Sequence, residues 1–204
     1  MSPTSADKDW PNYYEITLDR APCDAVRLAL DNFDREGAPD RPRLAVDLGC
    51  GGGRDAIELL RRGWAVLAID AEPAAIEVLC AREDLPPTGE LQTLVSRFED
   101  ASWPDADLVN SGFALPLVPQ AKFAALWQRI VGSLKSGGRF SGQLYGDRDG
   151  WVGDPTNSFF TRDQVERLLD QLEVEHFHEE EVESKTRRGK TKRWHVFHIV
   201  ARKP

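Results

Sequence analysis

Four of the five residues from 49 to 53 are glycines, in the stretch VDLGCGGGRD between an apolar run and a segment with helical spacing. Glycine lets a chain turn tightly between a strand and a helix, and its missing side chain lets a ligand approach the backbone. Dinucleotide-binding turns use the spacing G-x-G-x-x-G, but Arg54 stands at the third glycine position. The spacing therefore disfavours a nicotinamide dinucleotide at this turn.

A different pattern, D-x-G-x-G-x-G, is matched at every position by Asp47, Gly49, Gly51 and Gly53. With this motif the chain resembles the class I S-adenosylmethionine-dependent methyltransferases over about residues 44–202. The resemblance implies an α/β fold with a Rossmann-like, doubly wound sheet of seven strands flanked by helices. The implied strand order is 3-2-1-4-5-7-6, with the last strand antiparallel, and the implied cofactor is S-adenosylmethionine.

The resemblance also implies which residues contact that cofactor. Asp47 would face the methionine ammonium, and the backbone of Gly49, Cys50 and Gly51 would lie beside the methionine and ribose. Asp70, which is 21 residues after Gly49, would accept hydrogen bonds from both ribose hydroxyls. The complete set of cofactor-binding residues expected on this basis is Asp47, Gly49, Cys50, Gly51, Asp70, Ala71, Phe98, Glu99, Asn110 and Ser111.

Two later segments contribute to this set. Glu99 lies four residues before a Trp-Pro pair, where the family usually has its acceptor for the adenine amine, and Phe98 would border the ring. The family more often has Asp at that place. Asn110 and Ser111 end a predicted strand, where the family lines the methyl-transfer pocket. The resemblance therefore implies that both segments lie at the same edge of the sheet as the glycine turn.

The sequence also restricts the methyl acceptor. Methylases of nucleic-acid amines commonly have D/N-P-P-Y/F after the fourth strand, whereas this chain has NSGFALP. Asn110 and Asp147 are too few acidic or amide ligands for the magnesium site of catechol-type enzymes, so no metal is expected. The segments GGRFSGQLYGDRDGW, FFTRDQVERLL and KRWHVFHIVARK look like bacterial methyltransferases of the tellurite-resistance type. A small-molecule acceptor is the resulting expectation.

The sequence identifies no catalytic base. A thiolate or oxyanion acceptor needs only orientation, whereas a neutral hydroxyl or amine needs a base with a pKa near 7. Tyr145 and His195 are weak candidates: a solvated loop is the alternative for Tyr145, and a structural or exposed position is the favoured alternative for His195. His195 and His198 fall on opposite faces of one predicted strand, so at most one can face a pocket. His176 and His178 share a face, but no third metal ligand has suitable spacing.

Short apolar strands alternate with helical periodicity along the chain, which favours a parallel α/β sheet. Predicted strands cover 44–48, 64–70, 91–96, 107–111, 139–146, 173–184 and 193–202, and predicted helices include 22–36, 123–134 and 162–172. We expect a single domain, 1–204, with an N-terminal helical lid and linker in 1–43 and the core in 44–204. Tyr13, Tyr14 and Arg20 are candidate lid residues, with packing as the alternative.

Composition supports a globular protein of 204 residues, 41% of them apolar, with a formal net charge of −8. No apolar run is long enough for a membrane span, and Cys23, Cys50 and Cys80 have no metal-site or disulfide pattern. We therefore expect a cytoplasmic protein, with no membrane partner and with its oligomeric state left open. Two alternatives to an active methyltransferase remain: a cofactor-binding module without catalysis, and an NAD-linked oxidoreductase.

The segment KTRRGKTKR is strongly basic, and the neighbouring HEEEVE is acidic. Ion pairs between two adjacent strands explain this pair of segments better than a nucleic-acid surface does. Nucleic acid is therefore an unlikely partner. If RNA were the acceptor, charge reversal at Arg187, Arg188 and Lys190 should abolish its binding.

Overall fold

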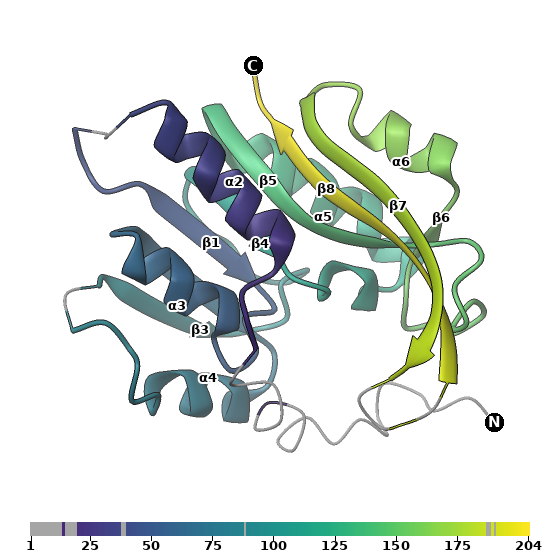
Figure 1. Ribbon diagram of the computed structural model, residues 1–204, viewed down its shortest axis with the longest axis horizontal. Coiled ribbons are helices and arrows are strands. Elements are labelled where there is room, and N and C mark those ends of the chain that lie inside the picture. The colour runs from purple at the N-terminus through teal and green to yellow at the C-terminus, as the bar shows by residue number, and fades with distance from the viewer. Residues whose placement is uncertain (1–13, 15–19, 38–39, 88, 187–188, 190) are drawn as a thin grey trace.

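The computed structural model describes residues 14, 20–37, 40–87, 89–186, 189 and 191–204. One mixed sheet forms its centre, with the strand order β3-β2-β1-β4-β5-β8-β7 (Figure 1). The strands are β1 (Leu44–Leu48), β2 (Ala65–Asp70), β3 (Leu91–Val95), β4 (Ala106–Ser111), β5 (Leu134–Gly146), β6 (Phe159–Phe160), β7 (Glu173–Lys185) and β8 (Thr191–Arg202). Strands β1 to β5 pair in parallel, and β8 is antiparallel to both β5 and β7. The predicted order and the antiparallel last strand are confirmed, and the two-residue β6 beside β5 is an addition.

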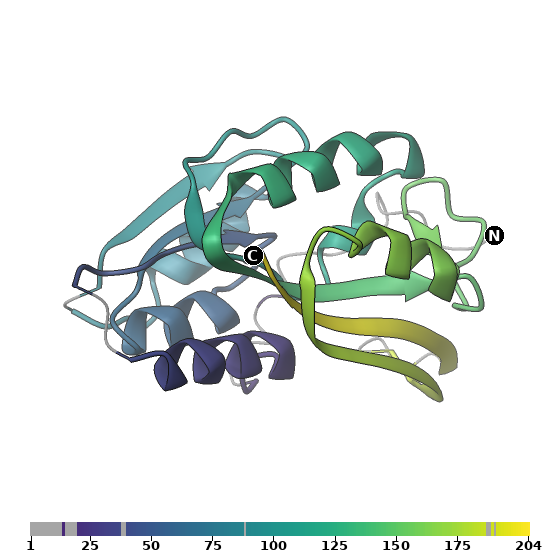
Figure 2. The same ribbon diagram turned by 90° about the horizontal axis from the view of Figure 1, so that it is seen from above.

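Helices cover both faces of the sheet, as a parallel sheet requires. Helices α2 (Asp24–Arg35), α3 (Arg54–Arg61) and α4 (Pro73–Cys80) lie on one face, and α5 (Gln120–Ser133) and α6 (Arg162–Leu168) lie on the other (Figure 2). Two apolar clusters correspond to these two faces. Val26, Leu30, Leu59 and Leu79 belong to the α2 side, and Phe123 belongs to the α5 side. In the following sections the first face is called the α2 face and the second the α5 face.

Local sequence signals set most helix ends. Thr161 caps α6 in a reciprocal capping box with Gln164, as its spacing predicts. Gly63 follows α3 with φ +79°, and Pro73 begins α4. The helix predicted over 162–172 is shorter, since α6 ends at Leu168.

The prediction that a strand begins at residue 139 is wrong. Helix α5 ends at Ser133 and β5 begins at Leu134, five residues before the predicted strand. The physical reason is tertiary: the Gly137 N–H donates to the Lys203 carbonyl at 2.8 Å, and the Lys203 N–H donates to the Gly138 carbonyl at 2.8 Å. The C-terminal end of the chain thus draws these glycines into the sheet, which a local pattern cannot reveal.

Some expectations fall on residues that the structure does not describe. These are Tyr13 of the expected lid and the basic residues Arg187, Arg188 and Lys190. In the described ranges, no helix has the length and apolar character needed to cross a membrane. Tyr14 and Arg20 are described, and Tyr14 is buried beside the glycine turn.

Candidate functional site

The glycine turn joins the end of β1 to the start of α3. Gly49, Gly51 and Gly53 have φ of +74°, +53° and +84°, which is the left-handed region that favours glycine. The N–H groups of Gly49 and Cys50 both donate to the Ile69 carbonyl, at 2.8 and 3.1 Å. These bonds fix the turn against the end of β2, and therefore at the C-terminal edge of the sheet, where open α/β sheets bind ligands.

The bare sides of these glycines are in close contact with the protein itself. A Cβ atom at Gly49 would lie 2.2 Å from the Ala114 Cβ and 3.5 Å from the Phe98 ring. A Cβ at Gly51 would lie 3.4 Å from the Tyr14 ring. Close packing therefore explains the absence of a side chain at Gly49, and positive φ favours glycine at both positions, while backbone contact with a ligand stays a prediction.

Asp47 and Asn110 lie side by side at this edge, because β1 and β4 pair in parallel with these two residues in register. The Asn110 Nδ2 donates to Asp47 Oδ1 at 2.8 Å and is 3.2 Å from Asp55 Oδ2. The Ser141 hydroxyl on β5 donates to Asn110 Oδ1 at 2.7 Å, which fixes the orientation of the amide. The structure thus brings together two predicted residues and adds two that the sequence analysis missed, Asp55 and Ser141.

Asp55 lies in the first turn of α3, where a carboxylate is favoured by the helix dipole. Its Oδ1 accepts the Cys23 N–H at 2.9 Å and the Arg54 Nε–H at 3.1 Å. Because Cys23 immediately precedes α2, Asp55 connects the start of α2 to the site. The only sequence signal for Asp55 is its place after the glycine turn, which does not reveal these contacts.

Asp47 is in an unusual electrostatic position. Its side chain is buried, and burial together with the neighbouring Asp55 raises the pKa of Asp47 to about 7. Its second oxygen, Oδ2, is buried and has no hydrogen-bond partner within the described part of the chain. Such an oxygen is costly unless a ligand supplies a donor, and a cationic donor suits a carboxylate best.

Asp70 ends β2 on the other side of the glycine turn. Its Oδ2 accepts the Gly51 N–H at 2.9 Å, and its Oδ1 accepts the Glu72 N–H at 3.0 Å. Burial raises the pKa of Asp70 above its usual value, against the lowering effect of these two backbone donors. Each oxygen keeps further acceptor capacity, which suits a pair of hydroxyl groups. Ala71, the next residue, is exposed.

The remaining expected cofactor residues surround the same edge. Phe98 is mostly buried, with its ring close to Gly49. Glu99 pairs with Arg97 at 2.7 Å and with Lys122 at 3.5 Å, through one oxygen, Oε1. The Ser111 hydroxyl donates to the Leu48 carbonyl at 3.1 Å, which joins the ends of β4 and β1. Their contacts with a cofactor stay predictions.

The two weak catalytic candidates lie outside this cluster. His195 is buried, its Nδ1 accepts the Arg148 N–H at 3.1 Å, and its Nε2 lies 2.9 Å from Glu179 Oε1. Its β8 neighbour Phe197 packs in the cluster of the α5 face, whereas Asp47 and Asn110 point to the α2 face. Since side chains alternate along a strand, His195 also points to the α5 face. This arrangement gives His195 a structural role.

Tyr145 packs among aromatic rings instead of beside Asp47. Its ring centroid is 5.8 Å from that of Trp151 and 6.3 Å from that of Trp194. The Lys192 ammonium lies 4.6 Å from the Tyr145 ring centroid. The ring therefore forms part of a packed cluster between the end of β5 and the start of β8.

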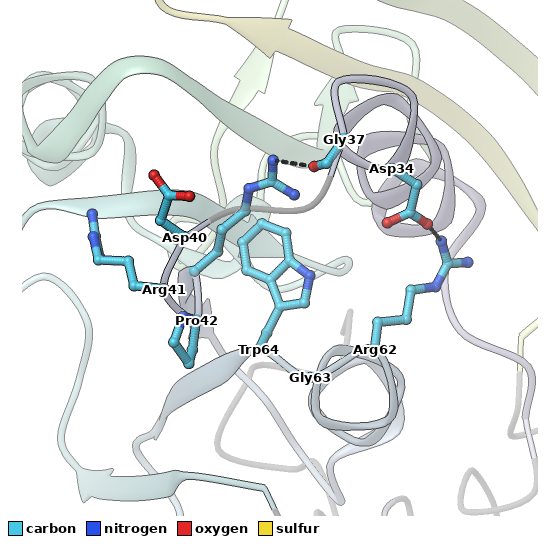
Figure 3. Close-up of a pocket in the computed structure, with 9 residues that line it drawn as sticks. Asp34, Gly37, Asp40, Arg41, Pro42, Arg62, Gly63 and Trp64 are labelled. Carbon is cyan, nitrogen blue, oxygen red and sulfur yellow. Dashed lines mark hydrogen bonds and ion pairs between the residues drawn. The ribbon is translucent and has the colours of Figure 1, made fainter.

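Two cavities lie away from the glycine turn. The first, of about 560 Å³, includes Pro42, Arg62 and Trp64, at the edge of the sheet where β1 and β2 begin (Figure 3). The second, of about 520 Å³, lies between α2 and the β7–β8 hairpin. Its lining includes the side chains His176, His178, Glu180 and His198. Within the described residues, no group of three or more His, Cys, Asp or Glu side chains is arranged to hold a metal ion. We place the candidate site at the glycine turn because its buried acceptor, Asp47 Oδ2, has no partner in the described ranges, whereas the first cavity is at the edge of the sheet opposite the strands' C-terminal ends.

Comparison with known proteins identifies a family for the part of the chain that contains this turn. Residues 45–138 match the family model described as a methyltransferase domain. This stretch runs from β1 through the glycine turn and into β5. A search of curated proteins found no match.

Solved structures share the fold over almost the whole chain. TehB from Haemophilus influenzae has a TM-score of 0.73 and 17% identity, covering 96% of this chain and 67% of its own. An S-adenosylmethionine-dependent methyltransferase from Methanosarcina mazei has a TM-score of 0.63 and 19% identity, covering 84% of this chain and 96% of its own. Magnesium protoporphyrin IX methyltransferase from Synechocystis PCC 6803, solved with bound S-adenosylmethionine, has a TM-score of 0.63 and 13% identity. It covers 98% of this chain and 100% of its own. At these identities the likeness establishes the fold.

Proposed function

We propose that the chain, whose residues 45–138 match the family model of a methyltransferase domain, transfers a methyl group from S-adenosylmethionine to a small-molecule acceptor. The observation that carries the proposal is the buried Oδ2 of Asp47 beside the glycine turn, which has no hydrogen-bond partner among the residues that the structure describes. A carboxylate oxygen in that position fits the ammonium of an amino-acid cofactor. A dinucleotide pyrophosphate is anionic and would be repelled by the same oxygen.

Different residues at the C-terminal edge of the sheet would bind different parts of the cofactor. Asp47 would hold the methionine ammonium, and Asp70 would accept the ribose hydroxyls. Phe98 and Glu99 would border the adenine, and Asn110 and Ser111 would line the methyl-transfer pocket. The backbone of Gly49, Cys50, Gly51 and Ala71 would complete the contacts. The fit rests on the unpartnered Asp47 oxygen and on the remaining acceptor capacity of Asp70.

S-adenosylmethionine supplies a methyl group already activated by its sulfonium. The protein then needs to align the acceptor for in-line displacement and to exclude water. The engagement of both His195 ring nitrogens, by Arg148 and Glu179, supports a structural role for this residue in place of that of a base. The absence of an identified base favours an acceptor that is already a thiolate, an oxyanion or another soft nucleophile.

We also propose that the chain forms one domain in which the N-terminal part covers the cofactor edge. The support is the contact of the Tyr14 ring with Gly51 and the hydrogen bond from the Cys23 N–H to Asp55. Both contacts connect segments before β1 with residues at the glycine turn. This is the position expected of a lid.

Calorimetry with two ligands tests the cofactor assignment. We expect S-adenosylhomocysteine to bind and NADH to give no heat of binding. Binding of NADH alone would favour the oxidoreductase alternative and overturn the proposal. The transfer itself is tested by incubating the protein with S-adenosylmethionine labelled in the methyl group and fractionated cell extract. We expect label in small molecules, whereas binding without transfer to any fraction would favour a catalytically silent module.

A further inference from the structure

Two carboxylates at the site share one hydrogen-bond donor group. The Asn110 amide nitrogen lies 2.8 Å from Asp47 Oδ1 and 3.2 Å from Asp55 Oδ2, and both aspartates are buried. Two buried carboxylates this close to one amide repel each other when both are ionised. The pair therefore favours keeping a proton on one carboxyl group until a positive charge enters the site.

The surroundings determine which aspartate keeps the proton. Asp55 accepts hydrogen bonds from the Cys23 N–H and from the Nε–H of the charged Arg54, so its carboxylate has a cationic partner. Asp47 accepts one hydrogen bond, from the neutral amide of Asn110, and its Oδ2 has no partner in the described residues. The charged or titratable groups around Asp47 are Asp55 and Arg54 of α3, Asp70 of β2, Cys50 of the turn and Cys23 before α2.

The Cys23 and Cys50 thiols add no charge beside Asp47. Burial raises the pKa of the Cys23 thiol, with a further contribution from Asp55, and burial also raises the pKa of the Cys50 thiol. Both thiols are therefore neutral over the physiological range. Arg54 opposes the two acidic neighbours, but its Nε–H is directed to Asp55. Asp47 is thus the group of this cluster that takes up the proton.

We propose that Asp55 is a positioning residue that, with Asn110, keeps Asp47 protonated in the free protein, so that binding of the cofactor's ammonium group releases that proton. This inference rests on the proposed function, because it concerns the same ligand. The protons balance simply: the ammonium keeps its three hydrogens, the Asp47 carboxyl ionises, and its proton passes to the buffer. Asn110 holds Oδ1, which leaves Oδ2 for the ammonium.

Calorimetry of the wild-type chain with S-adenosylhomocysteine, in two buffers of different ionisation enthalpy, measures the released proton. With the pKa of Asp47 at about 7, we expect release of about 0.9 proton at about pH 6 and about 0.1 at about pH 8. The affinity should rise over the same range, since binding no longer has to expel a proton. Binding at about pH 6 with the same heat in both buffers would overturn this inference and leave the proposed function intact. No binding at either pH would instead contradict the proposed function.

Three variants assign the proton to its residue. Asp47→Asn should weaken S-adenosylhomocysteine binding and remove the proton release. Asp55→Asn should reduce the release at about pH 6, because loss of the neighbouring charge lowers the pKa of Asp47. Asp31→Asn is the matched control, since Asp31 is an α2 carboxylate that pairs with Arg62 away from the site, and its proton release should equal that of the wild type. Unchanged release in a folded Asp55→Asn protein would contradict the role of Asp55. If that variant does not fold, the wild-type measurement and Asp47→Asn still decide the inference.

Discussion

Two polar clusters of this protein, each with buried charged groups at its centre, differ in how completely their groups are paired. The carboxylate pair, Asp47 and Asp55 with Asn110 between them, leaves the Asp47 Oδ2 without a partner in the described structure. The second cluster, at the start of β8, is here called the hairpin cluster. Its members are Arg148, Asp149, Glu179, Lys192 and His195.

In the hairpin cluster each charge meets an opposite charge or an aromatic ring. The Lys192 ammonium lies 2.8 Å from Asp149 Oδ1, and 3.5 and 3.6 Å from the ring centroids of Trp151 and Trp194. His195 uses both ring nitrogens. The comparison indicates that burial of charged groups alone does not identify a binding site, and we expect a buried acceptor without a donor in the described residues to be the more specific signal. The hairpin cluster should affect stability, and the carboxylate pair should affect binding.

The largest effect is expected from Lys192→Met. The side chain of Asp149 is fully buried, so loss of Lys192 leaves this buried carboxylate without its cationic partner and with only the backbone N–H groups of Trp151 and His195, and we expect the free energy of unfolding to fall by about 3–5 kcal/mol. Urea unfolding measures this loss, and S-adenosylhomocysteine affinity measured below the unfolding transition should be unchanged. Arg193→Met is the control, because Arg193 is exposed and pairs with Glu181. This substitution should lower the free energy of unfolding by less than about 1 kcal/mol. Equal losses in the two variants would contradict the distinction between the clusters.

The next effect is expected from Gly49→Ala, which combines a steric and a conformational cost. Its φ of +74° costs alanine about 1–2 kcal/mol, and overlap with Ala114 adds about 1–3 kcal/mol. Gly63→Ala provides the control, since Gly63 has φ +79° with nothing within 4 Å of its Cβ position. In thermal or urea unfolding, the free energy of unfolding of Gly49→Ala should be lower than that of Gly63→Ala by about 1–3 kcal/mol. Only Gly49→Ala should also weaken S-adenosylhomocysteine binding, and a normal affinity would contradict the role of this turn.

A smaller effect is expected from Asp70→Ala, which tests the ribose contact. We expect S-adenosylhomocysteine affinity to fall at least about tenfold, which is the order of one lost charge-assisted bidentate contact. Asp107→Ala is the matched control, because Asp107 also accepts a backbone N–H, from Leu44 at 2.8 Å, but lies where β4 begins. Calorimetry should give the control wild-type affinity. An unchanged affinity in Asp70→Ala would refute the ribose assignment.

Much of the fold and part of the candidate site can be predicted from the sequence. Strand alternation, the capping box and the glycine motif are local signals that predict the strands, a helix start and the place of the turn, whereas the sheet order was implied by the family resemblance. Asp47 and Asn110 are likewise expected at strand ends, and parallel pairing in register brings them together. The two-residue β6 is missed because it exists only through its pairing with β5.

The side-chain contacts that distinguish the carboxylate pair from the hairpin cluster cannot be predicted from local sequence signals. Asp55 reaches Cys23 across 32 positions, and Ser141 reaches Asn110 across 31. These contacts depend on the docking of α2 and on the register of β5, which no local pattern encodes. The same holds for His195, whose role is decided by Glu179 on the adjacent strand. Residue type alone made His195 a catalytic candidate, and its partners make it structural.

The smallest effect concerns the pH dependence of the hairpin cluster. The hydrogen bond from His195, together with those from Arg148 and Arg162, lowers the pKa of Glu179 from its ordinary value of 4.5 to about 2. A carboxyl group with a lowered pKa in the folded state stabilises the protein above its unfolded pKa. That contribution should therefore be present above about pH 4.5 and be lost as the pH falls toward 2.

Glu179→Gln removes this titration and should make the free energy of unfolding depend less on pH between about 4.5 and 2. Because the side chain is 20% exposed, solvent screens these interactions, and the difference should be about 1 kcal/mol or less. Urea unfolding at several pH values measures the slope. Glu183→Gln, at an exposed position of the same strand, should keep the wild-type slope. A Glu179→Gln slope equal to that of the wild type would mean that the pairing of Glu179 does not stabilise the fold. The hairpin cluster could then no longer serve as the fully paired counterpart of the carboxylate pair.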